Sequence, residues 1–430
     1  MISFPKVDKL PELTLSEIQQ YLESGLFRGI GKKTAQTLVE HFGYDTLLVI
    51  DTAPEKLLAV PQLGKSRIDK ITKAWSESKA NPIRGAIAQL LAVRTSLRLT
   101  LKICDYYGHQ TSSVLKSDPY KLIDDIEGIG FKTADELAIS LGIPLSSETR
   151  YSKGLLHVLK EALSEGNCFL PESHLLARAV SLLQRQEHTP DYKSLSNILG
   201  QLVENQTLVY GEVANSVYQR AAYRAELSVA LKIQTLVNRP TYSTEHLEHW
   251  LANFEAPEYK ELSRLSDEQI SALFMAVKHP ISIITGGPGR GKTHVLKTLV
   301  QWLASIGATI ALAAPTGKAA NRMKDATGME ASTIHRLLQW QGLGHAFHYN
   351  ENNLLDIDWL IVDEFSMVDI FLFNSLLKAL PAKTKILLVG DSDQLPSVGA
   401  GMVLRDLLNS EIVPTTRLQT IFRQRDKSPI

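Results

Sequence analysis

The sequence predicts a multidomain protein in which an all-α helix-hairpin-helix N-terminal region precedes an α/β domain with a parallel sheet. A glycine-containing hairpin pattern occurs twice within residues 26–138, and a phosphate-binding loop lies at 286–293. Short apolar runs that are typical of buried parallel strands stand before and after this loop. The chain has 430 residues, 44% of them hydrophobic, which is enough for two or three domains with ordinary cores.

The first hairpin pattern is LFRGIGKKTAQTLVEHFG at 26–43, and IEGIGFKTADELA at 126–138 repeats it. Glycines allow the hairpin backbone to approach a phosphate, lysines add charge, and a small alanine lets the two helices cross closely. The alternative is that the glycines are only turns between packed helices. We expect these hairpins to bind DNA through Gly29, Gly31, Lys32, Lys33, Gly128, Gly130 and Lys132.

Two segments of the N-terminal region match when the sequence is shifted from Gly43 to Gly108. This pattern predicts an internal duplication, with one unit at 1–80 and the other at 81–147. The inner hairpins, VPQLGKSR at 60 and VRTSLR at 93, keep one glycine or none. Phosphate contacts are therefore expected mainly at the first and last hairpins.

A connecting region with no catalytic chemistry of its own follows the hairpins. Residues 148–225 combine an amphipathic helix with short strand-like runs, which favours a small winged-helix-like domain. Residues 226–264 are interpreted as a linker, with a helix in AELSVALKIQTLVN and a looser connection after it.

The phosphate-binding loop, GGPGRGKT, stands between a buried strand, ISIIT at 281–285, and a helix that ends at Gly307. In this context the loop N–H groups converge on phosphates, Lys292 reaches the β and γ oxygens, and Thr293 offers its hydroxyl to Mg²⁺. A glycine turn with an unrelated lysine is the alternative, which the strand-loop-helix order disfavours. The predicted cofactors are ATP and Mg²⁺, and the predicted cofactor-binding residues of the loop are Gly286, Gly287, Pro288, Gly289, Arg290, Gly291, Lys292, Thr293 and His294.

Acidic and amide side chains follow two further predicted strands. IDWLIV at 357–362 ends in Asp363 and Glu364 at the edge where a parallel sheet opens its ligand crevice. Asp363 is expected to hold Mg²⁺ directly or through water, and Glu364 to orient and deprotonate the attacking water, although such pairs also occur in solvated loops. KILLVG at 385–390 leads to Asp391, Asp393 and Gln394, which are placed to contact the γ-phosphate.

The segment ATIALAAPTGKAANRM at 308–323 predicts another strand, a Pro-Thr-Gly turn and a helix with a basic start. Thr316, Gly317, Lys318 and Arg322 suit a nucleic-acid backbone. On composition alone, an ordinary strand-to-helix loop remains the alternative.

The order and spacing of these motifs resemble those of RecD-like DNA helicases of superfamily one, the branch that moves 5′ to 3′ on single strands. LSDEQ at 265–269 resembles the adenine-reading Q motif, which implies that Gln269 contacts the base. GGPGRGKT resembles motif I, with Arg290 where the family more often has a small residue. The resemblance implies a RecA-like P-loop NTPase domain, motor domain 1A, at 265–417.

The same resemblance implies the remaining site residues. LAAPTGKAANRM resembles motif Ia, and ASTIHRLL at 331–338 resembles the motif that follows it. Both motifs contact single-stranded DNA in the family, which implies such contacts for Pro315, Thr316, Gly317, Lys318, Arg322 and His335. IVDEFSMVD resembles motif II, and VGDSDQLPSVGAG resembles motif III, which couples nucleotide state to the DNA track. LQTIFRQ at 418–424 resembles motif IV. The catalytic residues implied are Lys292, Asp363, Glu364, Gln394 and Arg423, the last as a finger for the γ-phosphate.

The family continues into a second RecA-like domain with motifs V and VI, and the resemblance assigns only its start, 418–430, to this sequence. Such a motor steps because two RecA-like domains open and close across ATP, so one domain alone is expected to bind nucleotide without stepping. Two explanations stay open: a part of a longer protein, or a remnant with impaired unwinding. The rival function is a DNA-binding adaptor with a switch-like nucleotide domain.

The amino-acid composition excludes few classes of binding partner. Lys and Arg number 46 against 46 Asp and Glu, so DNA binding must depend on local placement of charge. Cys104 and Cys168 form no metal pattern, and no signal peptide or spanning segment is evident, which favours a cytoplasmic protein. The partners implied are single-stranded DNA and duplex junctions, with no membrane, a monomeric state, a possible single-strand-binding protein, and a role in repair or recombination.

Overall fold

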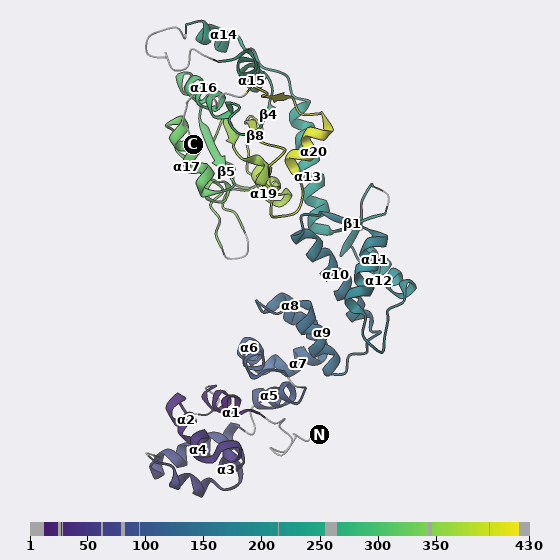
Figure 1. Ribbon diagram of the computed structural model, residues 1–430, viewed down its shortest axis with the longest axis vertical. Helices are drawn as coiled ribbons and strands as arrows, with labels where there is room; N and C mark the ends of the chain where they lie inside the picture. Colours follow the sequence, from purple (N-terminus) through teal and green to yellow (C-terminus); the bar gives the residue numbers. More distant parts are fainter. Residues whose placement is uncertain are drawn as a thin grey trace, which may run out of the picture. The chain divides into compact units, whose positions relative to one another are not determined.

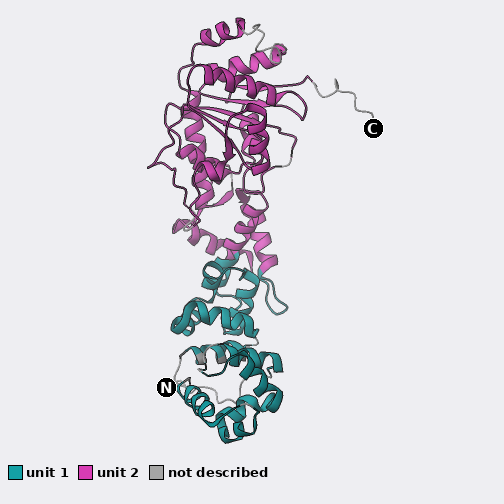
Figure 2. Ribbon diagram, turned by 90° about the vertical axis from the view of Figure 1, so that its left-hand side faces the viewer, with its two compact units in different colours: residues 1–154, 183–190 teal, residues 155–182, 191–430 magenta. Residues whose placement is uncertain are grey.

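The computed structural model describes residues 13–420 apart from 25, 26, 28, 62, 79–81, 94, 214, 254–264, 343–345 and 395. The described residues form two compact units (Figure 2). Unit 1 runs to Gly154 and includes Leu183–Pro190, and unit 2 contains Leu155–Leu182 and the residues from Asp191 onward. The division falls inside helix α10 (Glu148–Ser164), a few residues beyond the boundary expected at 147.

Unit 1 is all-α up to α10. Thr14 starts its first helix with a capping box, in which its side chain and that of Glu17 each bond the other's backbone N–H. The elements are α1 (Leu15–Glu23), α2 (Lys32–Phe42), η2 (Gly43–Asp45), α3 (Thr46–Thr52), η3 (Pro54–Ala59), α4 (Lys65–Ser78), α5 (Pro82–Ala92), α6 (Leu97–Tyr107), η4 (Gly108–Gln110), α7 (Thr111–Ser117), η5 (Pro119–Lys121), α8 (Leu122–Asp125) and α9 (Phe131–Ser140).

The two segments matched by the sequence shift have the same local structure. Gly43 and Gly108 end α2 and α6 with φ values of 56° and 52°. The next helix begins in each case with a threonine whose hydroxyl donates to that glycine's carbonyl, at 2.6 Å for Thr46 and 2.8 Å for Thr111. A 3-10 turn, an α-helix and a proline-initiated 3-10 turn follow in both, which is the pattern that a duplication produces.

A buried ion network joins the last hairpin of unit 1 to α10. The Asp135 carboxylate of α9 accepts hydrogen bonds from the Arg150 Nε at 2.8 Å, the Arg185 Nη2 at 2.8 Å and the Tyr120 hydroxyl at 2.8 Å. Asp135 and Arg150 are both completely buried. Burial, followed by the bond to Asp135, raises the pKa of Tyr120. The network fixes the helix that carries the last hairpin.

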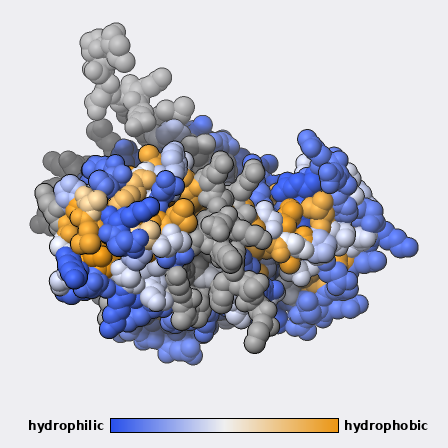
Figure 3. Space-filling model, turned by 90° about the horizontal axis from the view of Figure 1, so that it is seen from below, coloured by the Kyte–Doolittle hydropathy of each residue, from blue (hydrophilic) through white to orange (hydrophobic). Residues whose placement is uncertain are grey.

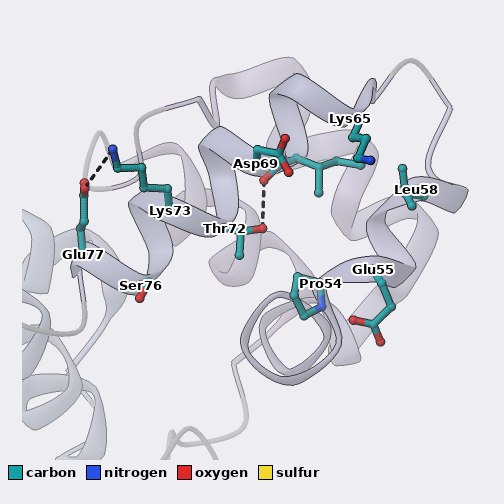
Figure 4. A pocket seen from close by; sticks show the side chains of 10 residues that line it. Pro54, Glu55, Leu58, Lys65, Asp69, Thr72, Lys73, Ser76 and Glu77 are labelled. Atoms are coloured by element: carbon teal, nitrogen blue, oxygen red, sulfur yellow. Dashed lines mark hydrogen bonds and ion pairs between the residues drawn. The ribbon is translucent and has the colours of Figure 1, made fainter.

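A groove of about 600 Å³ lies between η3 and α4 in unit 1 (Figure 4). Its charged lining is of both signs, and Lys73 and Glu77 pair across 3.9 Å. The lining includes Leu58, Lys65, Asp69, Lys73 and Glu77. Mixed charge of this kind is unlike a phosphate cradle, which is lined by cations and backbone N–H groups.

The surface seen from below in Figure 3 has hydrophilic residues interrupted by hydrophobic patches. In unit 1 the exposed large hydrophobic side chains include Tyr44, Leu48, Leu58 and Tyr106. Within the described residues, no helix has both the length and the apolarity to cross a membrane.

Unit 2 begins with a small antiparallel sheet of order β1-β3-β2, formed by β1 (Phe169–Pro171), β2 (Leu208–Tyr210) and β3 (Ser216–Gln219). Helices α11 (Glu172–Leu183) and α12 (Tyr192–Glu204) lie between the first two strands in the sequence. Helix α13 (Arg220–Val237) starts before the boundary expected at 225 and packs on α19 (Ile370–Lys378). The looser connection contains helix α14 (Glu245–Ala252) in its described part.

The second sheet has six parallel strands in the order β6-β5-β7-β8-β4-β9. Its helices cover both faces, with α16 and α17 on one side and α13 and α19 on the other (Figure 1). The elements are α15 (Asp267–Lys278), β4 (Ile281–Thr285), α16 (Lys292–Ser305), β5 (Ile310–Ala314), α17 (Gly317–Thr327), β6 (Ala331–Thr333), α18 (Ile334–Leu337), β7 (Trp359–Val362), η8 (Phe365–Met367), α19, β8 (Lys385–Gly390), α20 (Val403–Ser410) and β9 (Thr415–Arg417).

Strand residues alternate between the two cores of this sheet, as the pleat requires. Ile283 and Leu388 lie in the core shared with α13 and α19, and Ile284 and Val389 lie in the core shared with α15 and α16. Strand β4 is buried at every position. The α/β class with a parallel sheet, predicted from the sequence, is confirmed.

Candidate nucleotide and DNA site

Parallel pairing places the carboxyl ends of all six strands of the large sheet at one edge. The loop after β4 neighbours the segments that follow β8 on one side and β9 on the other, and β7 lies next to β8. The segments after β5 and β6 lie beyond β7 along the same edge. The predicted nucleotide-binding residues of the loop are therefore on the β4 side, and the predicted DNA-binding residues of this domain are on the β5 side.

The phosphate loop leaves β4 at Gly286 and enters α16 through Gly291, whose φ of 83° is left-handed and suits glycine. Gly286 has no room for a side chain, because a Cβ there would lie 2.8 Å from the Leu418 carbonyl oxygen. The first N–H groups of a helix have no intrahelical partner and attract anions. The loop thus has the backbone form of a phosphate cradle.

The Lys292 ammonium group lies inside this loop. Its Nζ donates to the Gly286 carbonyl at 2.5 Å and to the Gly287 carbonyl at 3.1 Å. These carbonyls hold the ammonium at the first turn of the loop. A cation held there is positioned to receive the phosphates of a nucleotide.

The other predicted residues of the loop differ in exposure. Pro288 and Thr293 are exposed, and Gly289 has a φ of 76°. The His294 N–H donates to the Gly291 carbonyl at 3.0 Å, and burial together with the charge of Lys297 lowers the pKa of the His294 imidazole. Their contacts with a nucleotide stay predictions.

The acidic pair follows β7 at the same edge. The Glu364 N–H donates to Asp363 Oδ1 at 2.9 Å, and Glu364 has a φ of 52°, an uncommon conformation for a residue with a side chain. Burial raises the pKa of Asp363, and the charges of Lys292 and Arg322 oppose this shift. Residues from three separate sequence motifs therefore act on one carboxylate.

Asp391 is buried directly after β8 and organises the turn that follows it. Its carboxylate accepts from the Asp393 N–H at 3.1 Å and from the Gln394 Nε2 at 3.3 Å. Gln394 is otherwise exposed at the sheet edge. The structure places it beside the strand that leads into the phosphate loop, and its contact with a γ-phosphate stays a prediction.

The Gln269 side chain is buried and its amide already has partners at both ends. Its Oε1 accepts from the Ser266 N–H at 3.0 Å, and its Nε2 donates to the Gly291 carbonyl at 3.4 Å. The Gln269 side chain is therefore hydrogen-bonded to the end of the phosphate loop. Its contact with an adenine base stays a prediction.

The predicted magnesium ligands, Thr293 and Asp363, are oxygen donors at the loop after β4 and at the end of β7, two strands that are separated by β8. Mg²⁺ prefers one or two such ligands together with phosphates and water. Within the described residues, no group of three or more His, Cys, Asp or Glu side chains forms a separate metal site. The donor set fits Mg²⁺ that arrives with a nucleotide.

The segment that follows β9 contacts the phosphate loop, and the sequence did not reveal this contact. The Leu418 N–H donates to the Thr285 carbonyl at 2.8 Å, and the Arg290 Nη1 donates to the Gln419 carbonyl at 2.6 Å. Glu268 accepts from the N–H groups of Gln419 and Thr420 at 2.9 and 3.2 Å. The only sequence signal was the arginine at a position that the family usually fills with a small residue.

Arg423, the predicted arginine finger, lies outside the described residues.

The predicted DNA residues after β5 form the start of α17. The Thr316 hydroxyl caps this helix by accepting from the Ala319 N–H at 3.3 Å, with Pro315 just before it and Gly317 open to solvent. Lys318 and Arg322 are exposed and lie one helical turn apart on the same face. A capped helix start with two cations suits a phosphate backbone.

His335 lies in an aromatic cluster that the sequence reasoning missed. Its ring centroid is 6.1 Å from that of Trp340 and 5.8 Å from that of Phe347, and these two rings are 4.9 Å apart. Trp340 is 42% exposed. Exposed aromatic faces bind unpaired bases by stacking, so these residues extend the predicted DNA surface.

The outer hairpins of unit 1 share one backbone form. Gly29 and Gly128 have φ values of 100° and 85°, and Gly31 and Gly130 are extended residues that precede α2 and α9. The lysines predicted to contact DNA are exposed in the first turns of these helices: Lys32, Lys33 and Lys132. Helix starts with neighbouring cations are suited to phosphate.

Family models match three parts of the chain. A model of the AAA domain matches residues 269–400, a model of the ATP-dependent RecD2 DNA helicase HHH domain matches 79–169, and a model of the SAM-like helix-hairpin-helix tandem matches 27–77. These ranges contain the site residues from Gln269 to Gln394 and both hairpins.

Two curated relatives agree with the models. The ATP-dependent RecD2 DNA helicase of Deinococcus radiodurans is 33% identical over 97% of this chain and 58% of its own length. The RecBCD enzyme subunit RecD of Haemophilus influenzae is 37% identical over 38% of this chain and 29% of its own length. The chain thus spans little more than half of the first relative and less of the second.

Among solved structures, the Pif1 helicase from Candida albicans is 26% identical over 38% of this chain and 41% of its own, with a TM-score of 0.31. At that TM-score the likeness adds nothing to the assignment.

The parallel sheet, the phosphate loop and the acidic pair are typical of a P-loop nucleoside triphosphatase domain, in the region that the AAA-domain model matches. Two findings point to a smaller group of proteins: the match to the RecD2 HHH-domain model, and the 33% identity to the Deinococcus radiodurans protein along nearly the whole chain. The chain is RecD-like: it is similar to proteins of superfamily one that carry N-terminal helix-hairpin-helix repeats.

Proposed function

We propose that this chain is the hairpin region and first motor domain of an ATP-dependent DNA helicase that moves 5′ to 3′ on single-stranded DNA. The main support is the carboxyl edge of the large sheet, where the phosphate loop after β4, the acidic pair after β7 and the basic helix start after β5 all follow strands of one parallel sheet. The residues proposed to bind nucleotide and those proposed to bind DNA share this edge, so a change at one set would reach the other through strands β4, β8, β7 and β5.

The chemistry assigned to the nucleotide residues is phosphoryl transfer to water. Bound Mg²⁺ would neutralise charge on the phosphate oxygens, with Thr293 and Asp363 as its protein ligands. Lys292 would bind the β and γ oxygens, and the N–H groups at the start of α16 would hold the remaining phosphate oxygens. Glu364 would orient the attacking water and accept its proton.

The DNA residues are assigned to two places, each within its own compact unit. In unit 2, Thr316, Lys318 and Arg322 would hold the backbone of a single strand, and the rings around His335 would stack on its bases. In unit 1, the outer hairpins would hold phosphates of a duplex junction. A monomeric state, a single-strand-binding partner and a role in repair or recombination stay predictions.

A DNA-binding adaptor is the second candidate. It is favoured by the location of the hairpins in unit 1, a compact unit that contains none of the nucleotide-binding residues. In that case the hairpins would bind DNA and the nucleotide domain would act as a switch without turnover.

The deciding experiment measures ATP turnover of the 430-residue chain with and without single-stranded DNA. The helicase proposal predicts turnover that DNA raises by about tenfold or more, because DNA bound along α17 lies at the sheet edge that carries Asp363. Nucleotide binding with no turnover under either condition would favour the adaptor. ATP turnover that is the same with and without DNA would contradict coupling between the DNA-binding and nucleotide-binding residues.

Alanine at both Gly29 and Gly128 is expected to weaken DNA binding by about tenfold or more, because hydrogen bonds from the backbone to phosphate are lost when these left-handed turns rearrange. Affinity for a labelled duplex junction, measured by fluorescence anisotropy, checks this. Basal ATP turnover should not change, since neither glycine belongs to the nucleotide site.

The matched control is alanine at Gly108 and Gly142, which have φ values of 52° and 96° and open space where a Cβ would lie. These changes impose similar backbone strain in unit 1 outside the predicted phosphate contacts. Equal losses of affinity in the two double variants would remove the hairpins from the DNA-binding surface.

A further inference from the structure

The backbone of Gln419 is hydrogen-bonded to two charged side chains, one of them from the phosphate loop. Arg290 donates to its carbonyl oxygen at 2.6 Å, and Glu268 accepts from its N–H at 2.9 Å and from the next N–H at 3.2 Å. Both partners are charged, so each bond is stronger than a bond between neutral groups. The pKa of Glu268 is lowered by these two N–H bonds and by the charge of Arg290.

The Arg290 side chain is folded against the loop that carries it. A Cβ at Gly287 would lie 3.1 Å from the Arg290 Nε, and one at Gly286 would lie 3.6 Å from its Cδ. The carbonyls of these two glycines also hold the Lys292 ammonium. Two cations therefore converge on the first turn of the phosphate loop.

A nucleotide phosphate would compete with the Gln419 carbonyl for the Arg290 guanidinium. A neutral carbonyl accepts one bond from it, whereas a phosphate offers several charged oxygens that match the guanidinium fork. Glu268 would keep its bonds to the backbone, because it contacts the other side of the same segment.

We propose that Arg290 is a positioning residue that links occupancy of the phosphate loop to the position of residues 418–420. In the nucleotide-free protein it holds Gln419 over the loop. When a nucleotide binds, the guanidinium moves to a phosphate oxygen, while Gln419 and Thr420 keep their bonds to Glu268 and Leu418 keeps its bond to the Thr285 carbonyl. This inference rests on the proposed nucleotide binding and assigns a role to the arginine that replaces the family's usual small residue.

The test is amide hydrogen exchange at Gln419 and Thr420 in the full chain, with and without a non-hydrolysable ATP analogue and Mg²⁺. In the free protein, Arg290→Ala should speed exchange roughly two- to tenfold, the effect of losing one net hydrogen bond. Glu268→Gln should speed it by about tenfold or more, since a charged acceptor is lost. The analogue should bring the wild-type protein to the Arg290→Ala rate.

Two matched controls accompany these variants. Asp267→Asn removes a neighbouring carboxylate from the same helical turn as Glu268, and Arg405→Ala removes an exposed arginine elsewhere in the domain. Neither residue contacts the 418–420 segment through a hydrogen bond found in the described residues. Both should leave the exchange of Gln419 and Thr420 unchanged.

Binding of the analogue is measured in parallel, which separates this inference from the proposed function. If the analogue binds but leaves wild-type exchange unchanged, or if Arg290→Ala exchanges like the wild type in the free protein, the inference is overturned. If the wild-type chain binds no analogue at all, the nucleotide site itself is disproved, and the response assigned to Arg290 is disproved with it.

Discussion

Replacement of Lys292 by alanine is expected to reduce ATP turnover by roughly 10²- to 10³-fold, the usual cost of removing one charge-stabilising donor from a transition state. The ammonium lies inside the phosphate loop on the Gly286 and Gly287 carbonyls, and no other lysine of this loop can replace it. Affinity for a duplex junction in the absence of nucleotide should stay within about twofold, because none of the residues proposed to bind DNA belongs to the phosphate loop.

Steady-state turnover and junction binding are measured on the same preparation of this variant. Lys278→Ala is the control, since this exposed lysine belongs to the same domain but lies at the opposite end of α15 from the loop. Turnover within threefold of the wild type in Lys292→Ala would show that the loop is not the hydrolytic site. A parallel loss of DNA binding would indicate unfolding rather than a catalytic defect.

Replacement of Asp135 by alanine is expected to destabilise unit 1 by about 3–5 kcal/mol, the cost of leaving a buried charge without its partner. Arg150 is completely buried, and its guanidinium donates to Asp135 at 2.8 and 3.0 Å. Its remaining partners, the Leu145 and Leu183 carbonyls, carry no full charge. Because the chain has two units, the measurement is amide exchange in α9 and α10 rather than one unfolding curve.

The neighbouring variant Glu136→Ala serves as the control, because Glu136 is exposed on the same helix. It should change the protection of α9 by less than about 0.5 kcal/mol. A similarly small effect for Asp135→Ala would mean that the ion network contributes little to this unit. The last hairpin is carried by α9, so its DNA contacts should weaken together with the protection.

Local patterns were sufficient to predict most of the large sheet. The runs at 281–285 and 385–390 are the strands β4 and β8, and the segment around 308–323 contains β5 and the start of α17. These runs are apolar, short and bounded by turn residues, so their structure depends on neighbouring residues in the chain. Since all the strands are parallel, their polar ends also had to meet at one edge.

Contacts between distant segments were not predictable in this way. The bond from Arg290 to Gln419 joins positions 129 residues apart, and the bond from Gln269 to Gly291 joins positions 22 apart. Neither involves a periodic pattern, since each depends on how β9 and α15 pack beside the phosphate loop. The cluster of Trp340 and Phe347 around His335 is local in the chain, but it follows no periodic pattern, so it was missed as well.

Helix α13 also determines where the protein can be divided. Its apolar face, including Ala225, Val229 and Ile233, belongs to the same core as the β4 and β8 residues that face α19. A fragment that begins at the Q motif would lack α13. The apolar residues of the sheet and of α19 that pack against α13 would then be exposed to water, which favours aggregation. The connecting helix and the nucleotide domain are thus one cooperative folding unit, and any dissection of this protein should keep α13 with the sheet.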